Sequence, residues 1–209
     1  MKLYEYYRSS CSYRLRIALN IKNIAAEQMH INLLKGEQST DDYIKINPQG
    51  TVPTLVDGDV SIYQSIAALE YLEESHPLPP LLPDNLNDKA YIRTLCHHIS
   101  SGIQPVNNIG VLNYLKNTLN ISEEQKNKWL HDWIGKGLSS LESMLDKSED
   151  FCFGNSITMA DICLVPQVYN AMRFECNMSN LPKITSIYEK CMQQDEFRKA
   201  SPENHPFAS

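Results

Sequence analysis

Long apolar runs are missing from the 209-residue chain. No stretch approaches the roughly 20 apolar residues that a membrane-spanning helix requires, so the sequence predicts no membrane partner. The first eight residues carry charges where a secretory signal would be apolar. A cytoplasmic location is the corresponding expectation.

An excess of basic residues is also missing. The chain has 19 Lys and Arg against 25 Asp and Glu, a formal net charge of −6. Nucleic-acid-binding proteins usually present a basic face, so no nucleic-acid partner is predicted. An anionic small substrate stays possible, because a few arginines in a cleft can outweigh the overall sign locally.

Cysteine and histidine motifs are absent as well. The six cysteines include no C-x-x-C pair, and their spacing does not suggest a disulfide framework. There is no H-E-x-x-H, and the adjacent His97 and His98 would point about 100° apart on a helix. The sequence therefore predicts reduced thiols and no metal site.

The first third of the chain alternates between strand and helix patterns. The order strand, helix, strand, loop, hairpin, helix predicts a small mixed sheet with helices on its faces. The expected ranges are 2–6 (strand), 11–19 (helix), 28–32 (strand), 38–47 (loop with a helical turn), 54–63 (hairpin with a turn at Asp-Gly) and 66–75 (helix).

A proline-rich stretch separates this region from one with helical patterns only. Residues 76–83 hold four of the eleven prolines and cannot form a helix. Two capping-box patterns follow, Ser122 with Gln125 and Thr158 with Asp161. The predicted organisation is a domain over 1–76, a linker over 77–84 and an all-helical domain over 85–209.

Ser9, Ser10 and Cys11 lie between the first strand and the first long helix. A helix N-terminus presents unpaired N–H groups and partial positive charge, which stabilise an anion such as a thiolate. The alternative is that a serine merely caps the helix and Cys11 belongs to its apolar stripe. Of the two serines, Ser10 is expected to be the cap and Ser9 to face the cleft.

Two further positions precede a strand and a helix. Pro53 lies at a strand entrance, where a cis bond would expose the backbone of Val52 to a peptide-like ligand. Gln64 and Ser65 begin a helix and suit a carboxylate. An ordinary trans proline and plain N-capping remain the alternatives from pattern alone.

Taken together, these segments resemble the zeta class of the glutathione transferase superfamily. The stretch Y-R-S-S-C-S-Y-R-L-R-I-A-L is similar to the class signature S-S-C-x-W-R-x-R-I-A-L, with Tyr13 where Trp is usual. The other matching stretches are Asn47-Pro48-Gln49, Val52-Pro53-Thr54-Leu55, Gln64-Ser65, Gly102-Ile103-Gln104-Pro105, Thr158-Met159-Ala160-Asp161, Leu164-Val165-Pro166-Gln167 and Arg173-Phe174.

The resemblance implies a fold, a cofactor and a set of site residues. The fold is an N-terminal thioredoxin-like domain followed by a helical-bundle domain, the cofactor is glutathione, Pro53 is cis, and the chain forms a homodimer. The implied catalytic residues are Ser9, Ser10 and Cys11. The implied glutathione contacts are Gln38, Val52, Pro53, Gln64, Ser65, Gln104 and Asn108, and the implied substrate contacts are Arg8 and Arg173.

The implied activity is cis–trans isomerisation of maleylacetoacetate to fumarylacetoacetate, a step of tyrosine and phenylalanine catabolism. A glutathione thiolate, activated mainly by Ser9 with help from Ser10 and Cys11, would add to the double bond and leave after rotation. Ile109 and Gly110 stand where maleylpyruvate isomerases can carry arginines, which favours maleylacetoacetate. The alternatives are a maleylpyruvate isomerase, a broad glutathione transferase or weak peroxidase, and a non-enzymatic binding module.

Overall fold

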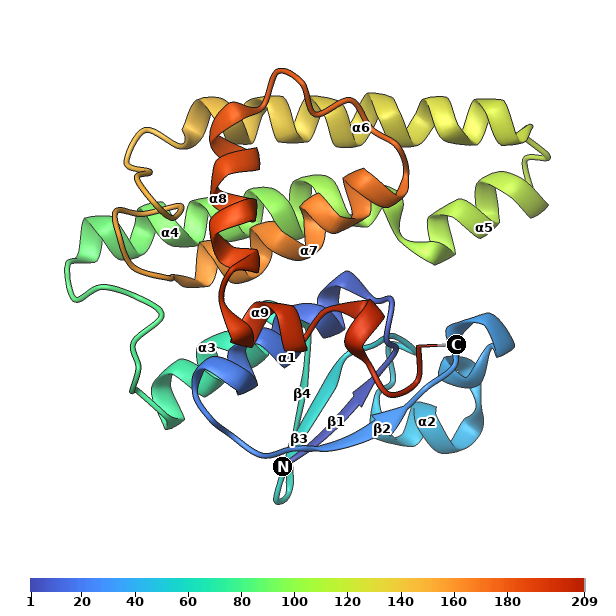
Figure 1. The fold of residues 1–209 in the computed structure, drawn as a ribbon. Helices are drawn as coiled ribbons and strands as arrows, with labels where there is room; N and C mark the ends of the chain where they lie inside the picture. Colours follow the sequence, from blue (N-terminus) through green and yellow to red (C-terminus); the bar gives the residue numbers. More distant parts are fainter. Residues whose placement is uncertain (209) are drawn as a thin grey trace. The chain divides into compact units, whose positions relative to one another are not determined.

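The computed structural model describes residues 1–208, which fall into two compact units (Figure 1). The first unit comprises Met1–Leu81 and the C-terminal stretch that begins at Met192, and the second comprises Leu82–Cys191. The division after Leu81 falls inside the stretch expected to be a linker. The C-terminal stretch, expected in the helical domain, instead groups with the first unit.

Hydrogen bonds explain why the C-terminal stretch belongs to the first unit. The Tyr13 hydroxyl donates to the carbonyl of Phe197 at 3.2 Å, and Arg16 Nε donates to the carbonyl of Ala200 at 2.8 Å. Tyr13, which replaces the usual Trp, is 1% exposed and has a partner for its hydroxyl.

The first unit is built on a four-stranded mixed sheet, as predicted, and the strand order is β2-β1-β3-β4. Strand β1 pairs parallel with β2 and antiparallel with β3. Leu3 and Leu55 face each other in register and are fully buried, which anchors the sheet to the core. The strands are β1 (Lys2–Glu5), β2 (Glu27–His30), β3 (Thr54–Asp57) and β4 (Val60–Tyr63).

Helices α1 and α3 pack beside each other in this unit (Figure 1). Their buried side chains include Leu15, Ile17, Leu69 and Leu72. The helical elements are α1 (Ser10–Ile21), η1 (Leu33–Lys35), η2 (Glu37–Ser39), α2 (Asp41–Ile46), α3 (Ser65–Ser75), α9 (Asp195–Lys199) and η5 (Pro202–Asn204).

The second unit is helical. Its elements are α4 (Leu86–His97), η3 (His98–Ile103, a π-helix), η4 (Gln104–Asn107), α5 (Ile109–Asn117), α6 (Glu123–Met144), α7 (Met159–Arg173) and α8 (Pro182–Met192), the last of which ends at the boundary of the first unit. Both predicted capping boxes are present, at the starts of α6 and α7.

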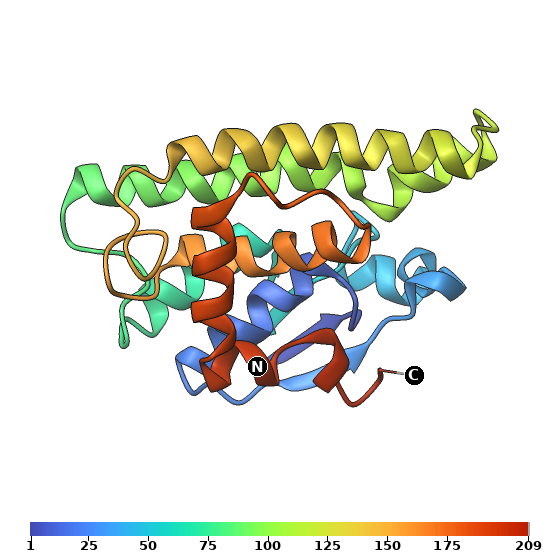
Figure 2. The same cartoon turned by 45° about the horizontal axis from the view of Figure 1, so that its top comes forward.

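The long helix α6 runs beside the rod formed by α4 and η3 (Figure 2). Gly137 permits this close approach, because a β-carbon there would lie 2.4 Å from Cγ1 of Ile103. His98 Nε2 lies 2.9 Å from the carbonyl of the same glycine. The segment that bears the Gly-Ile-Gln-Pro motif is therefore held tightly against α6.

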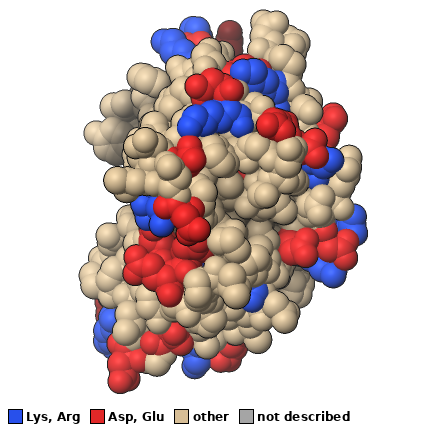
Figure 3. Space-filling view, turned by 90° about the vertical axis from the view of Figure 1, so that its left-hand side faces the viewer, with Lys and Arg blue, Asp and Glu red and all other residues tan. Residues whose placement is uncertain are grey.

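Two kinds of feature are absent from residues 1–208. None of their helices combines the length and apolarity needed to cross a membrane. Nor do these residues bring together three or more His, Cys, Asp or Glu side chains able to hold a metal ion. Figure 3 shows one face of the protein, where acidic and basic side chains are interspersed and the acidic ones form several groups.

Candidate active site

The turn between β1 and α1 places the serine pair at a helix N-terminus. Ser9 is the N-cap: its backbone is extended, and its Oγ accepts from the backbone N–H of Ser12 at 3.2 Å. The expectation that Ser10 caps the helix is therefore wrong. Ser10 is already inside the first turn and is 6% exposed, whereas Ser9 is half-buried. Because Ser9 Oγ accepts the capping bond, its own proton remains available to an acceptor outside the helix.

Cys11 is partly exposed, although the apolar stripe predicts an inward side chain. Its Sγ lies 3.8 Å from Nη1 of Arg14, which comes one turn later in α1. The other five cysteines, all within residues 1–208, are buried. Burial raises the pKa of the Cys152, Cys176 and Cys191 thiols, which suppresses their reactivity. The partly exposed thiol is thus the one beside the serine pair.

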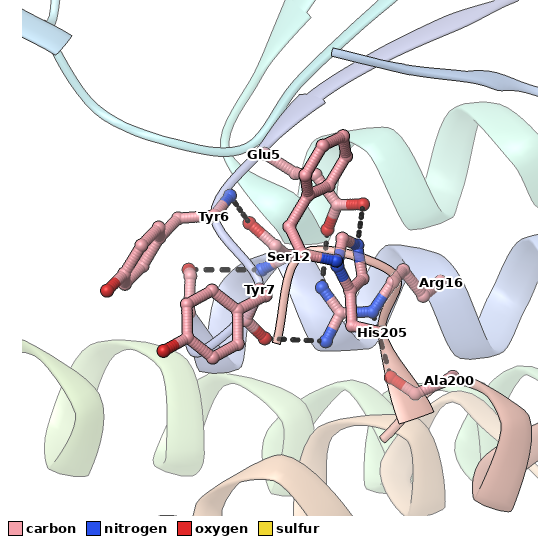
Figure 4. Close-up of polar contacts among 9 residues, drawn as sticks. Glu5, Tyr6, Tyr7, Ser12, Arg16, Ala200 and His205 are labelled. Atoms are coloured by element: carbon pink, nitrogen blue, oxygen red, sulfur yellow. Dashed lines mark hydrogen bonds and ion pairs between the residues drawn. The ribbon is translucent and has the colours of Figure 1, made fainter. Parts of the chain in front are cut away.

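A buried ionic network lies beneath the turn (Figure 4). The guanidinium of Arg16 pairs with the carboxylate of Glu5, and His205 Nε2 lies 2.8 Å from the other oxygen of that carboxylate. Arg16 also donates to the carbonyl of Tyr7 at 2.9 Å. All three charged or titratable side chains are no more than 5% exposed. The network fixes the backbone that leads into Ser9.

Arg8 lies over the aromatic pair that precedes it. Its Nη2 donates to the hydroxyl of Tyr6 at 3.1 Å, and its guanidinium carbon lies 5.1 Å from the centre of the Tyr7 ring. These contacts hold the guanidinium next to the Ser9 turn. Arg8 is half-buried.

The remaining predicted site residues of the first unit flank β3 and β4. The Val52–Pro53 bond is cis, as the resemblance implied, and so is the Leu78–Pro79 bond, which was not predicted. Gln38 lies near Gly50, and its side-chain Oε1 is buried without a hydrogen-bond partner among residues 1–208.

Gln64 adopts a backbone conformation that favours glycine. Its φ is +72° with ψ of 123°, and it precedes the first residue of α3, Ser65. Its exposed side chain donates to Gln49 Oε1 at 2.9 Å. Non-glycine residues in such regions cost about 1–3 kcal/mol and persist where the surroundings, often a functional site, require them.

Replacing Gln64 with glycine is therefore expected to separate stability from ligand binding. Relief of the strain should raise the midpoint of thermal unfolding, while loss of the amide should weaken about tenfold the glutathione binding that the sequence resemblance implies for this residue. Calorimetry measures both quantities. The matched variant Gln64→Ala should lose the same affinity without the gain in stability. Equal stabilities of the two variants would show that the positive φ carries no strain.

The second unit holds the other predicted contacts. Asn108 is the N-cap of α5, and its Oδ1 accepts from the backbone N–H of Gly110 at 2.8 Å. Gln104 begins η4 and is half-buried. Arg173 ends α7, is exposed, and stacks on Phe174 with its guanidinium carbon 4.4 Å from the ring centre.

Sequence reasoning missed Arg14. Its side chain is 1% exposed, and its Nη1 donates to Ser65 Oγ at 3.1 Å and to Cys11 Sγ at 3.8 Å. It thereby joins the first turn of α1 to the first turn of α3. A signal was available, because Arg14 and Arg16 both stand in the segment Ser12–Leu19, which is otherwise largely apolar.

Comparisons with known proteins give the arrangement a family. Residues 1–74 match the glutathione S-transferase N-terminal domain, and residues 108–199 match the glutathione S-transferase C-terminal domain. A probable maleylacetoacetate isomerase of Vibrio cholerae is 40% identical over 209 residues, covering 99% of this chain and 97% of that protein.

Solved structures agree with the sequence matches. The holo structure of a maleylpyruvate isomerase, a bacterial glutathione S-transferase in the zeta class, superposes with a TM-score of 0.98 at 38% identity over all of both chains. The maleylacetoacetate isomerase of Methylobacterium extorquens AM1, with bound malonate and glutathione, superposes with a TM-score of 0.97 at 33% identity, again over all of both chains.

Proposed function

Because this chain belongs to the glutathione S-transferase family, in its zeta class, we propose that it is a glutathione-dependent isomerase that converts maleylacetoacetate to fumarylacetoacetate. The observation that carries the proposal is the Ser9 N-cap, whose hydroxyl proton is available at the N-terminus of α1. Tyrosine and phenylalanine catabolism in the cytoplasm is the proposed setting.

The residues of the first unit fit glutathione. The N-termini of α1 and α3 provide two places where backbone N–H groups favour an anion. The buried Arg14 guanidinium leaves Nε and Nη2 without partners among residues 1–208, a surplus of positive charge that suits an anionic tripeptide. We assign glutathione to Gln38, Val52, Pro53, Gln64 and Ser65 in this unit, and to Gln104 and Asn108 in the second.

The proposed chemistry needs an activated thiol and a held dicarboxylate. When bound, glutathione supplies a thiolate that adds reversibly to the cis double bond, so that the bond can rotate before the thiolate leaves. The Ser9 hydroxyl donates a hydrogen bond that stabilises the thiolate, and Ser10 and Cys11 lie in the same turn to assist. Arg8 and Arg173 are the cations proposed to bind the substrate carboxylates.

A direct assay tests the proposal. The purified protein should isomerise maleylacetoacetate only when glutathione is added. The change in absorbance of the substrate's enol form measures the reaction. Maleylpyruvate is the second substrate to assay, because a maleylpyruvate isomerase is among the closely similar structures. Conjugation of chlorodinitrobenzene without isomerisation would instead indicate a general glutathione transferase. Failure to bind immobilised glutathione would leave only a binding module of another kind.

Cys11→Ala is expected to retain measurable isomerisation. Cys11 has no partner cysteine three residues away, and its Sγ lies 3.8 Å from Nη1 of Arg14. We therefore assign it a role that assists the glutathione thiol and not that of the covalent nucleophile. Initial rates at saturating glutathione measure the effect, and a several-fold loss is expected. Abolished activity in a variant with an unchanged circular dichroism spectrum would make Cys11 the covalent nucleophile.

We also propose that the chain is a homodimer, as is usual in the family. Exposed apolar side chains of the second unit, such as Val111, Tyr114 and Trp133, provide area for such a contact. Light scattering should give about twice the mass of one 23.9 kDa chain. A mass near that of one chain at micromolar concentration would contradict the proposal.

A further inference from the structure

Arg14 is a buried cation without a carboxylate partner in the described chain. Three cationic side chains of the α1 region are buried, and two of them have acidic partners: Arg16 pairs with Glu5, and Lys22 pairs with Glu73 at 2.7 Å. Within residues 1–208 the Arg14 side chain donates two hydrogen bonds, to Ser65 and to Cys11. Burying a guanidinium without a compensating anion costs free energy. We therefore expect a bound ligand to supply the negative charge.

The contact with Ser65 fixes the direction of a hydroxyl proton. Arginine can only donate, so Ser65 Oγ accepts from Nη1 at 3.1 Å, and its own proton must point away from Arg14. The proton meets no acceptor in the described chain, and Ser65 is the first residue of α3, where backbone N–H groups are also unpaired. The serine is therefore oriented as a donor toward an anion at this helix end.

We propose that Arg14 is a positioning residue that turns Ser65 into a donor for the α-carboxylate of the glutamyl part of glutathione and supplies the counter-charge for that carboxylate. The inference rests on the proposed function. Hydrogen bonds in a chain polarise one another, so a cation behind the serine strengthens the bond in front of it. Arg14 acts through Ser65, which itself contacts the ligand.

A comparison of two ligands tests this role. Calorimetry gives the affinities for glutathione and for 4-aminobutanoyl-cysteinyl-glycine, which differs from glutathione only by lacking the glutamyl α-carboxylate. The native protein should prefer glutathione. In Arg14→Gln the ratio of the two affinities should fall at least tenfold, because the variant weakens a hydrogen bond to a charged group. Arg14→Lys should keep part of it.

Two further variants separate this role from general support of the fold. Ser65→Ala should lower the same preference while leaving Arg14 in place, and it tests the proposal even if Arg14→Gln does not fold. Lys22→Gln removes another buried cation of the region and should lower stability while leaving the preference unchanged.

The outcomes are distinct. Arg14→Gln that weakens both ligands equally, or Ser65→Ala that keeps the full preference, would overturn the role of Arg14 while glutathione-dependent isomerisation stands. A native protein that binds neither ligand would overturn both.

Discussion

Replacing Ser9 with alanine is expected to lower the isomerisation rate at neutral pH several-fold, with about 100-fold as the upper limit. A hydrogen bond to an anionic acceptor contributes about 1.5–3 kcal/mol. Its loss raises the pKa of the bound glutathione thiol by about one to two units at 1.36 kcal/mol per unit. The thiolate fraction falls accordingly, and higher pH should restore part of the rate. Ultraviolet absorbance of the thiolate, titrated with glutathione bound, measures the shift directly.

The structure adds a second effect to this variant, because Ser9 also caps α1. Loss of the cap costs about 1 kcal/mol of stability with alanine, but only a few tenths with glycine. Ser9→Gly is therefore the control that removes the hydroxyl and spares most of the capping free energy. Both variants should titrate alike. Identical titration of the native protein and both variants would pass the role to Ser10 or Cys11.

Replacing Arg16 with methionine is expected to lower the free energy of unfolding by about 3–5 kcal/mol, since the buried Glu5 carboxylate loses its guanidinium partner and keeps only the contact with His205. Urea unfolding followed by fluorescence measures the loss. Removing both charges together, as Glu5→Gln with Arg16→Met, should recover part of it. Arg198→Met breaks an exposed ion pair with Asp195 and should leave the midpoint unchanged. A small effect of Arg16→Met would mean that water or the existing contact with His205 is enough to stabilise the carboxylate.

Local patterns predicted most elements, because their cause is local. Alternation of apolar residues predicted β1, and the Asp-Gly pair predicted the turn of the β3–β4 hairpin, where Gly58 has a φ of +57°. Both capping boxes formed, since each needs only residues three apart. The class motif indicated the Ser9 region, but the choice between two adjacent serines depends on which backbone is extended, and composition does not reveal this.

Non-local contacts were beyond the sequence. An arginine in a helical pattern is usually predicted to face solvent. Arg14 and Arg16 are buried instead, because Ser65 of α3 and the carbonyl of Ala200 in the C-terminal stretch accept hydrogen bonds from them. The same contacts explain why that stretch groups with the first unit, although its pattern is as helical as that of the segments before it. No periodicity in the sequence predicts which distant segment will supply a hydrogen-bond partner.

The bond between Glu5 and His205 joins residues 200 positions apart. During synthesis the strand that carries Glu5 emerges early, whereas its histidine partner is made only after every residue of the second unit. Domains commonly fold in the order in which they are made. Here a segment that is translated early must wait for one that is translated late, so the second unit can complete its structure before the first unit does.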